Sequence, residues 1–215
     1  MTEQSPPTPL EKPYRGVLSN AVWDEDVEAV KQLVAQGADV NETDAYGYTP
    51  LILAVINDNI ELVRFLLDKN ANINQKSRDG DTALNTAMRS NHEDAALELI
   101  EKGAFVNERG REGSTPLIWA IENGNATLVR RLLENDADPE VTNADGQTPM
   151  ERAVYYGDAD AQQLLTEAME AIRLRASEKA RALAEEASHR DTVVRLNFLR
   201  DKMKNRPKAK PGLAP

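Results

Sequence analysis

The two histidines of this 215-residue chain are the side chains best suited to bind a metal or transfer a proton near neutral pH. His92 and Glu93 begin like the helical motif of zinc proteases, but Ala96 stands where that motif needs its second histidine. His189 lies on a different part of the chain. The histidines therefore indicate neither a metal site nor a catalytic pair.

Other residue patterns that carry chemistry are also incomplete. The glycine-containing segment from Gly110 to Thr115 has no lysine, so it lacks the cation of a phosphate-binding loop. The chain has no cysteine, which excludes disulfides and thiolate metal ligands. Carboxylates are abundant, but nothing singles out an acid and a base with separated roles. We expect no catalysis and no cofactor.

A 33-residue repeat organises the middle of the chain. Gly47, Gly80, Gly113 and Gly146 open the phrases Gly-Tyr-Thr-Pro-Leu, Gly-Asp-Thr-Ala-Leu, Gly-Ser-Thr-Pro-Leu and Gly-Gln-Thr-Pro-Met. Units of this length cannot bury their apolar faces alone and stack into a solenoid. The natural binding surface of a solenoid is an open groove, so function should mean holding another macromolecule.

Each repeat predicts a loop followed by two helices. Thr before Pro is a helix start, because the Thr hydroxyl accepts from an unpaired backbone N–H and Pro suits the first helical position. Apolar residues such as Ile60, Val63 and Leu66 then form the stripe of a second helix. Where that helix ends, the chain needs residues that tolerate a left-handed backbone, and it has Gly37, Asn70, Gly103 and Asp136.

These phrases resemble the ankyrin repeat, in its Gly-x-Thr-Pro-Leu-x-x-Ala opening and its Gly-Ala-Asp-Val-Asn close at residues 37–41. The resemblance covers residues 16–168. It implies an all-α ankyrin-repeat solenoid of about five helix-turn-helix units with β-hairpin loops, at residues 16–46, 47–79, 80–112, 113–145 and 146–168. The family's usual His after Thr-Pro-Leu is absent, and Glu151 in that position is expected to form a capping box with Thr148.

Residues 169–203 are expected to form a C-terminal helical extension, because no Gly or Pro occurs between Gly157 and Pro207. Apolar residues from Leu165 to Ala187 are spaced by threes and fours, and a break is expected near residues 188–192. The extension either covers the open end of the stack up to about residue 187 or supplies a helix for a partner or a dimer. For residues 193–203 both interpretations remain open.

Charge and composition set the remaining expectations. The net charge is -10, yet six basic residues and one acidic residue follow Leu196. The acidic body argues against nucleic acid and favours a basic protein partner. Residues 1–15 are expected to be a disordered Pro-rich leader and residues 204–215 a basic disordered tail. No apolar run reaches membrane-spanning length, so a membrane role is not expected. A cytoplasmic location is expected, or a periplasmic or secreted one if a signal peptide has been removed.

The resemblance implies a protein-binding module that acts through its concave groove, as an inhibitor, an immunity-type protein or another regulator of a partner enzyme or toxin. The alternative is an adaptor, or a regulator associated with nucleic acid or membrane through the C-terminal helix and tail. The partner's identity is open, and the chain is expected to be a monomer, or a dimer through the C-terminal helix. The positions that contact partners in this family correspond to Trp23, Tyr46, Tyr48, Arg78, Asp79, Asp81, Arg89, Arg111, Glu112, Trp119, Glu122, Asn123, Arg152, Tyr155 and Tyr156.

Overall fold

The computed structural model describes residues 16–204, so the predicted leader and all but the first residue of the predicted tail lie outside the described residues. Within that range the regular secondary structure is entirely helical, which confirms the all-α class. The chain divides between Ala168 and Met169 into two units. The helices are α1 (Val17–Trp23), α2 (Val27–Ala35), α3 (Pro50–Ile56), α4 (Ile60–Asp68), α5 (Ala83–Arg89), α6 (Glu93–Glu101), the 3-10 turn η1 (Arg111–Gly113), α7 (Pro116–Glu122), α8 (Ala126–Glu134), α9 (Pro149–Tyr156) and α10 (Ala159–Lys204).

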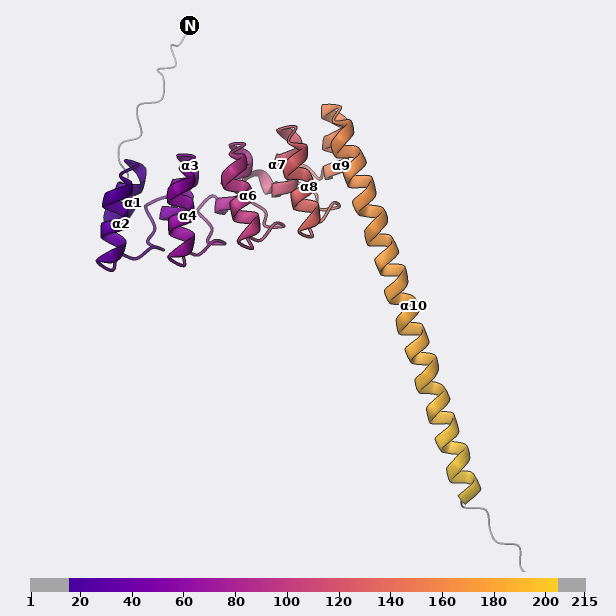
Figure 1. Ribbon diagram of the computed structural model, residues 1–215. Coiled ribbons are helices and arrows are strands. Elements are labelled where there is room, and N and C mark those ends of the chain that lie inside the picture. The colour runs from indigo at the N-terminus through magenta and orange to yellow at the C-terminus, as the bar shows by residue number, and fades with distance from the viewer. Residues whose placement is uncertain (1–15, 205–215) are drawn as a thin grey trace, which may run out of the picture. The chain divides into compact units, whose positions relative to one another are not determined.

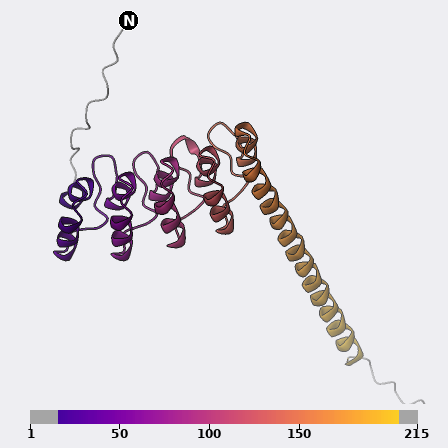
Figure 2. The same cartoon turned by 45° about the horizontal axis from the view of Figure 1, so that its top comes forward.

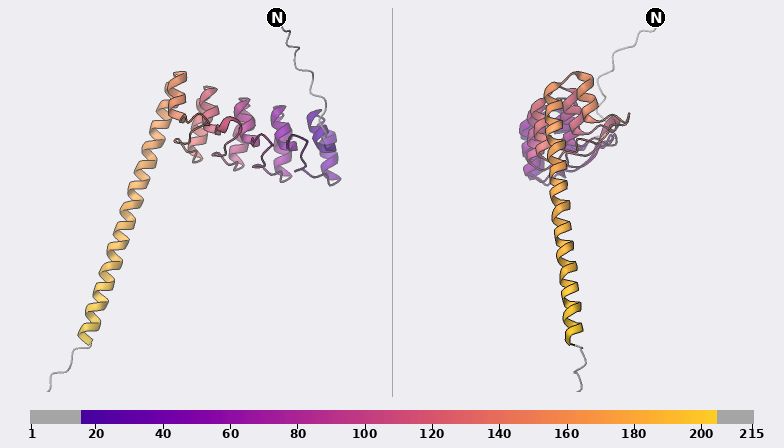
Figure 3. Two further views of the ribbon diagram at one scale, coloured as in Figure 1. Left: turned by 180° about the vertical axis from the view of Figure 1, so that it is seen from behind. Right: turned by 90° about the vertical axis from the view of Figure 1, so that its right-hand side faces the viewer.

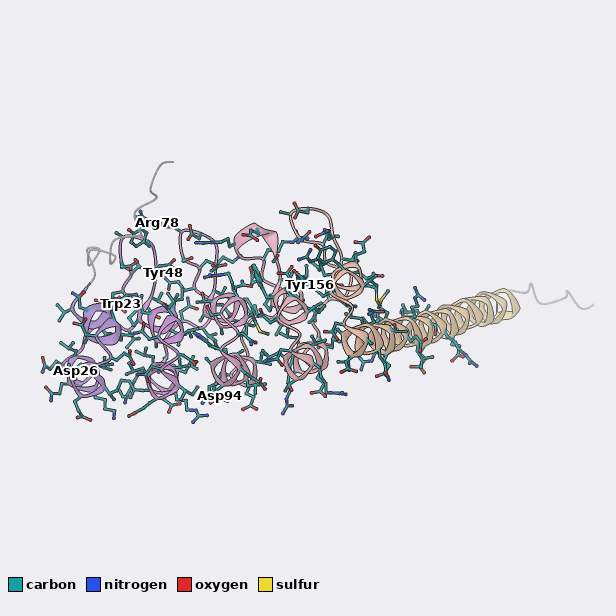
Figure 4. All side chains as sticks on the ribbon, turned by 90° about the horizontal axis from the view of Figure 1, so that it is seen from above. Trp23, Asp26, Tyr48, Arg78, Asp94 and Tyr156 are labelled. Carbon is teal, nitrogen blue, oxygen red and sulfur yellow. The ribbon has the colours of Figure 1, made fainter. Side chains whose placement is uncertain are left out.

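The first unit is a row of helix pairs that follow one another in chain order (Figure 1). The first helices of the pairs, α1, α3, α5, α7 and α9, each contact the next and form an inner row. Helices α2, α4, α6 and α8 form an outer row, and the connecting loops project beside the inner row (Figures 2 and 4). The view from behind keeps the same order of pairs (Figure 3).

Threonine caps set the start of the inner helices α3, α5, α7 and α9, as predicted. The Oγ1 atoms of four threonines accept from a backbone N–H three residues later, at 3.2, 3.2, 3.5 and 3.2 Å. Thr148 and Glu151 form the predicted capping box, because the Thr148 side chain accepts from Glu151 N–H and the Glu151 side chain accepts from Thr148 N–H. The backbone N–H groups of Ile52, Asn85, Ile118 and Glu151 donate to the Oγ1 atoms of Thr49, Thr82, Thr115 and Thr148, respectively.

The predicted left-handed residues are also in place after the outer helices. Asn70 and Asp136 both have a φ of 62°, while Gly37 and Gly103 have φ values of 90° and 84°. These residues turn the chain from each outer helix into the next loop. The loops contain no strand in the described residues, and each hairpin is closed by a backbone bond such as Asp44 N to Tyr48 O at 3.1 Å.

Small residues let the inner helices pack closely. Ala54, Ala87, Ala120 and Ala153 are each 0 % exposed and occupy the same position in successive repeats. A larger side chain at such a position would push neighbouring helices apart, at a typical cost of about 1–3 kcal/mol. The core around these alanines is one continuous cluster that reaches from Leu18 to Leu165.

An asparagine ladder joins successive repeats at the loops that follow the outer helices. The Oδ1 atom of Asn41 accepts from Asn72 N at 2.6 Å, and that of Asn74 accepts from Phe105 N at 2.8 Å. Asn107 continues the series by accepting from Asp138 N at 2.8 Å. The same bond therefore recurs at three successive junctions, so each repeat positions the next.

Helix α10 corrects one expectation. It runs from Ala159 to Lys204 without the break predicted near residues 188–192, because Ser and Thr lower helix propensity only slightly. Ala161 and Leu165, in its first-unit part, are buried in the core of the repeats. The expectation that the helix covers the end of the stack up to about residue 187 stays a prediction. Among residues 16–204, no helix combines the length and apolarity needed to cross a membrane.

Candidate functional site

The candidate site is the inner face, defined here as the surface made by the projecting loops and the inner helices α1, α3, α5, α7 and α9. Trp23, Tyr48, Arg78 and Tyr156 lie on this side of the molecule, whereas Asp94 lies on the outer row (Figure 4). The repeat therefore gathers residues from different units onto one surface. Two groups of aromatic side chains are found on it.

The first aromatic group lies on α9. Tyr155 is 74 % exposed and Tyr156 is 49 % exposed, and their rings meet edge to face with centroids 5.1 Å apart. The guanidinium of Arg152 lies 5.3 and 4.9 Å from the two ring centroids. An arginine over an aromatic face is attracted by the ring quadrupole, and this contact limits the motion of both rings.

Arg152 is itself held in place from the neighbouring repeat. Its Nη2 lies 2.5 Å from Oε1 of Glu122 on α7, and the two side chains are only 16 % and 15 % exposed. Nη2 also donates to the hydroxyl of Tyr156 at 2.8 Å, and Nη1 donates to Gln147 Oε1 at 3.2 Å. The aromatic pair is thus exposed to solvent but attached to a fixed support.

The second aromatic group lies in the loop between the first and second repeats. The rings of Tyr46 and Tyr48 have centroids 6.1 Å apart, with Tyr46 exposed and Tyr48 half-buried. Burial raises the pKa of Tyr48, and the nearby Asp79 carboxylate raises it further. Asp79 forms an ion pair with Arg111 of the next loop. The loop tips are therefore connected to one another and present aromatic and charged groups together.

Comparison with known families agrees with the repeat pattern. Residues 18–110 match the family described as ankyrin repeats (3 copies), and residues 99–153 match ankyrin repeats (many copies). The chain belongs to the ankyrin repeat family. No curated protein matches the sequence closely enough to count as a relative. Ankyrin repeats are in general protein–protein interaction modules.

Asp81 is one of the loop residues predicted to contact a partner, but its side chain is buried. It is 2 % exposed, accepts from Arg111 N at 2.7 Å and lies 3.6 Å from Nη2 of Arg89. Its carboxylate is used to fix the next loop, so it cannot meet a partner directly. Arg89 is therefore partly occupied by its ion pair with Asp81.

Three further residues that were predicted to contact a partner also pack in the core or bond between repeats. Trp23 and Trp119 are partly buried and pack against the hydrophobic core. Asn123 donates from Nδ2 to Met88 O at 2.6 Å, and Asn57 makes the equivalent bond to Val22 O at 3.2 Å two junctions earlier in the ankyrin stack. These residues connect repeats, and only part of each side chain remains for a partner.

The remaining predicted residues are open to solvent. Arg78, Asp79 and Arg111 are exposed at the loop tips. Glu112 is also exposed. It lies in the turn η1, where its backbone is left-handed with a φ of 59°. The accessible part of the inner face therefore consists of charged loop tips between the two tyrosine pairs.

Val154 is a surface residue that the sequence interpretation missed. The equivalent positions of the preceding ankyrin repeats, Val55, Met88 and Ile121, are each 0 % exposed, whereas Val154 is 60 % exposed. The reason is that each of those residues is covered by the following repeat, and no repeat follows the fifth in the described first unit. The signal that could have found it is the count of repeats, since the last one must lack a neighbour.

No group of three or more potential metal ligands is present among the described residues. Nδ1 of His92 lies 2.8 Å from Val55 O and therefore carries the hydrogen that joins two ankyrin repeats. His92 therefore connects the second and third repeats.

Proposed function

We propose that this ankyrin protein binds a partner protein through its inner face, with Tyr155 and Tyr156 as the main anchors. The observation that carries the proposal is that these two rings are 74 % and 49 % exposed while Arg152 holds them from one side. Exposed apolar residues scattered singly are ordinary on a protein surface. A supported pair of tyrosines beside the exposed Val154 is a more specific arrangement.

Pre-organisation is the physical reason for choosing these residues. Tyrosine gives a large contact area and has few rotamers to lose when a partner immobilises it. The edge-to-face packing of the two rings and the hydrogen bond from Arg152 to the Tyr156 hydroxyl restrict those rotamers before binding. Less conformational entropy is then lost in the complex.

The charge of the repeat unit favours a partner with a basic surface. Residues 16–168 contain 12 basic and 28 acidic residues. Several of the bases are already paired between repeats, as in Lys31 with Glu61 at 3.0 Å and Arg64 with Glu98 at 2.7 Å. The excess acid attracts a basic protein during encounter, and the association rate should fall as salt is added.

The finer role proposed is that of an inhibitor, immunity-type protein or other regulator that covers a functional surface of its partner. Support comes from the small repeat unit, which presents one continuous face. An assay of the partner's activity with and without this chain separates inhibition from simple scaffolding. Inhibition at stoichiometric amounts supports the regulator, and unchanged partner activity in a stable complex removes it.

The binding proposal itself is tested by affinity capture from native lysate followed by mass spectrometry. The wild-type chain should retain one dominant protein that a Tyr155→Ala, Tyr156→Ala variant loses. Phe105→Ala is the matched control, since Phe105 is 58 % exposed but lies in the asparagine ladder, away from the loop tips and inner helices. Capture that is identical for all three proteins would refute the role given to the tyrosines.

A further inference from the structure

Helix α9 of the fifth repeat exposes a face that the earlier repeats cover with their neighbours. Ile118 and Ile121 of the fourth repeat are fully buried, because α9 packs against α7. The residues 33 positions later, Glu151 and Val154, are exposed. With the exposed Tyr155 they form the end face, and their spacing of three and four positions places them on one side of α9. The end face meets the inner face at Tyr155.

The junction between the fourth and fifth repeats shows what contacts this position in the stack. Glu122 stands 33 positions before Tyr155. It is contacted by an arginine of the following repeat, Arg152, whose Nη2 lies 2.5 Å from Glu122 Oε1. The equivalent place beside Tyr155 is open, since no sixth repeat follows in the first unit. A guanidinium is therefore the group that the repeat geometry already accommodates there.

The tyrosine rings themselves already attract one guanidinium. The guanidinium carbon of Arg152 lies 5.3 Å from the ring centroid of Tyr155 and 4.9 Å from that of Tyr156. Most of the Tyr155 side chain is nevertheless exposed, so a second cation has access to its ring. A planar guanidinium stacks on an aromatic ring, whereas the ammonium of lysine does not, and this difference favours arginine.

Glu151 supplies a carboxylate with a fixed orientation one helical turn before Tyr155. Its Oε2 accepts from the backbone N–H of Thr148 at 2.8 Å and from the Thr148 hydroxyl at 3.1 Å. None of the described residues donates a hydrogen bond to its Oε1. A guanidinium stacked on Tyr155 has N–H groups within reach of this oxygen, and a hydrogen bond between two ions is a strong one.

The charge around the end face is negative. Residues 132–168 contain nine acidic residues and one basic residue, Arg152. Arg152 is largely shielded from water and is paired with Glu122. The exposed charges of this part of the chain are therefore acidic, and they attract a cationic group of a partner.

We propose that the end face binds an arginine side chain of the partner protein. The guanidinium stacks on Tyr155 and donates to Glu151 Oε1, and an apolar residue next to that arginine covers Val154. The inference rests on the proposed function, in which Tyr155 and Tyr156 anchor a partner. It adds the chemical group that the anchor holds.

Substitutions that separate the aromatic ring from its apolar volume test the stacking. The dissociation constant of the captured partner is measured by calorimetry. Tyr155→Phe keeps the ring and should bind like the wild type, whereas Tyr155→Leu keeps an apolar side chain and should bind about tenfold more weakly. Equal affinity of these two variants would overturn the inference. If Tyr155→Ala, Tyr156→Ala still loses the partner in that case, the proposed function stands with purely apolar anchors.

The carboxylate is tested by removing its charge alone. Glu151→Gln keeps the capping geometry and should weaken binding about fivefold, because a hydrogen bond to an ion becomes a neutral one. Asp160→Asn is the matched control, since Asp160 is another exposed acid of the fifth repeat but lies on α10, outside the end face. It should bind like the wild type. Equal effects of the two substitutions would show that only the overall charge matters and would remove Glu151 from the site.

Chemical footprinting identifies the partner's group. Phenylglyoxal modifies arginine side chains, and mass spectrometry locates the modified residues on the captured partner. At saturating amounts of this chain, the wild type and Tyr155→Phe should protect one partner arginine that Tyr155→Leu leaves reactive. A complex in which no partner arginine is protected, or in which all three proteins protect the same ones, would overturn the inference. Loss of capture by none of the tyrosine variants, the double alanine variant included, would remove the proposed function as well.

Discussion

Arg152 Nη2 lies 2.5 Å from Glu122 Oε1, and this ion pair joins the fourth repeat to the fifth at the base of the exposed tyrosine pair. Both side chains are largely shielded from water. Removing one partner would leave the other charge poorly solvated, which costs more than the bond itself contributes. The contact therefore supports both the stability of the last repeat and the orientation of Tyr155 and Tyr156.

Arg152→Met should lower the free energy of unfolding by about 1–3 kcal/mol, the range for loss of a hydrogen bond to a charged group. The measurement is urea unfolding followed by tryptophan fluorescence. Arg131→Met is the control, because Arg131 pairs with Glu134 at 3.4 Å where both side chains are half exposed. Its loss should cost less than about 1 kcal/mol. Equal effects of the two substitutions would mean that the shielding of Arg152 has no energetic consequence.

Leu165→Ala and Leu183→Ala compare the two parts of α10 with the same chemical change. Leu165 is 0 % exposed, so its truncation should cost about 2–5 kcal/mol in the unfolding of the repeat unit. Leu183 is 56 % exposed and should affect that unfolding by less than about 0.5 kcal/mol. Both tryptophans lie in the repeats, so fluorescence reports on that unit alone. A large effect of Leu183→Ala would show that residues beyond 169 do cover the repeats.

Asn74→Ala should lower the stability by about 1 kcal/mol, because it removes the bond to Phe105 N. Asn107→Ala should cost more, since Asn107 accepts from Asp138 N and also donates to Asp136 O at 3.0 Å. Thermal unfolding of the two variants and of the wild type gives the order of their stabilities. If neither substitution lowers the melting temperature, the ladder does not contribute to the cohesion of the stack.

The capping box predicts a pH dependence. Hydrogen bonds from the backbone N–H and hydroxyl of Thr148 lower the pKa of Glu151 below its usual value. A lowered pKa means that the contribution to stability is complete above about pH 4.3, the ordinary value for Glu, and is lost as the pH falls through the lowered value. Glu151→Gln keeps the capping geometry without a titrating group, so its melting temperature should vary less with pH in this acidic range. A pH profile identical to that of the wild type would contradict the assigned role.

The sequence predicted the features that depend on local chemistry. The threonine caps, the left-handed Asn70 and Asp136 and the buried alanines follow from residue type and repeat position. The burial of Asp81 could not be predicted, because it depends on the loop of the next repeat reaching back with Arg111 N. The exposure of Val154 depends on a neighbour that the fifth repeat lacks. The course of α10 depends on whether anything packs against it, which helix propensity does not decide.

The account depends most on the claim that the inner face binds a protein through Tyr155 and Tyr156. The direct test is the dissociation constant of the captured partner, measured by calorimetry with the wild type, with Tyr155→Ala, Tyr156→Ala and with Phe105→Ala. The tyrosine variant should lose more than about 2 kcal/mol of binding free energy while its melting temperature stays close to that of the wild type. The Phe105 variant should bind like the wild type. Equal affinity of all three proteins would contradict the claim.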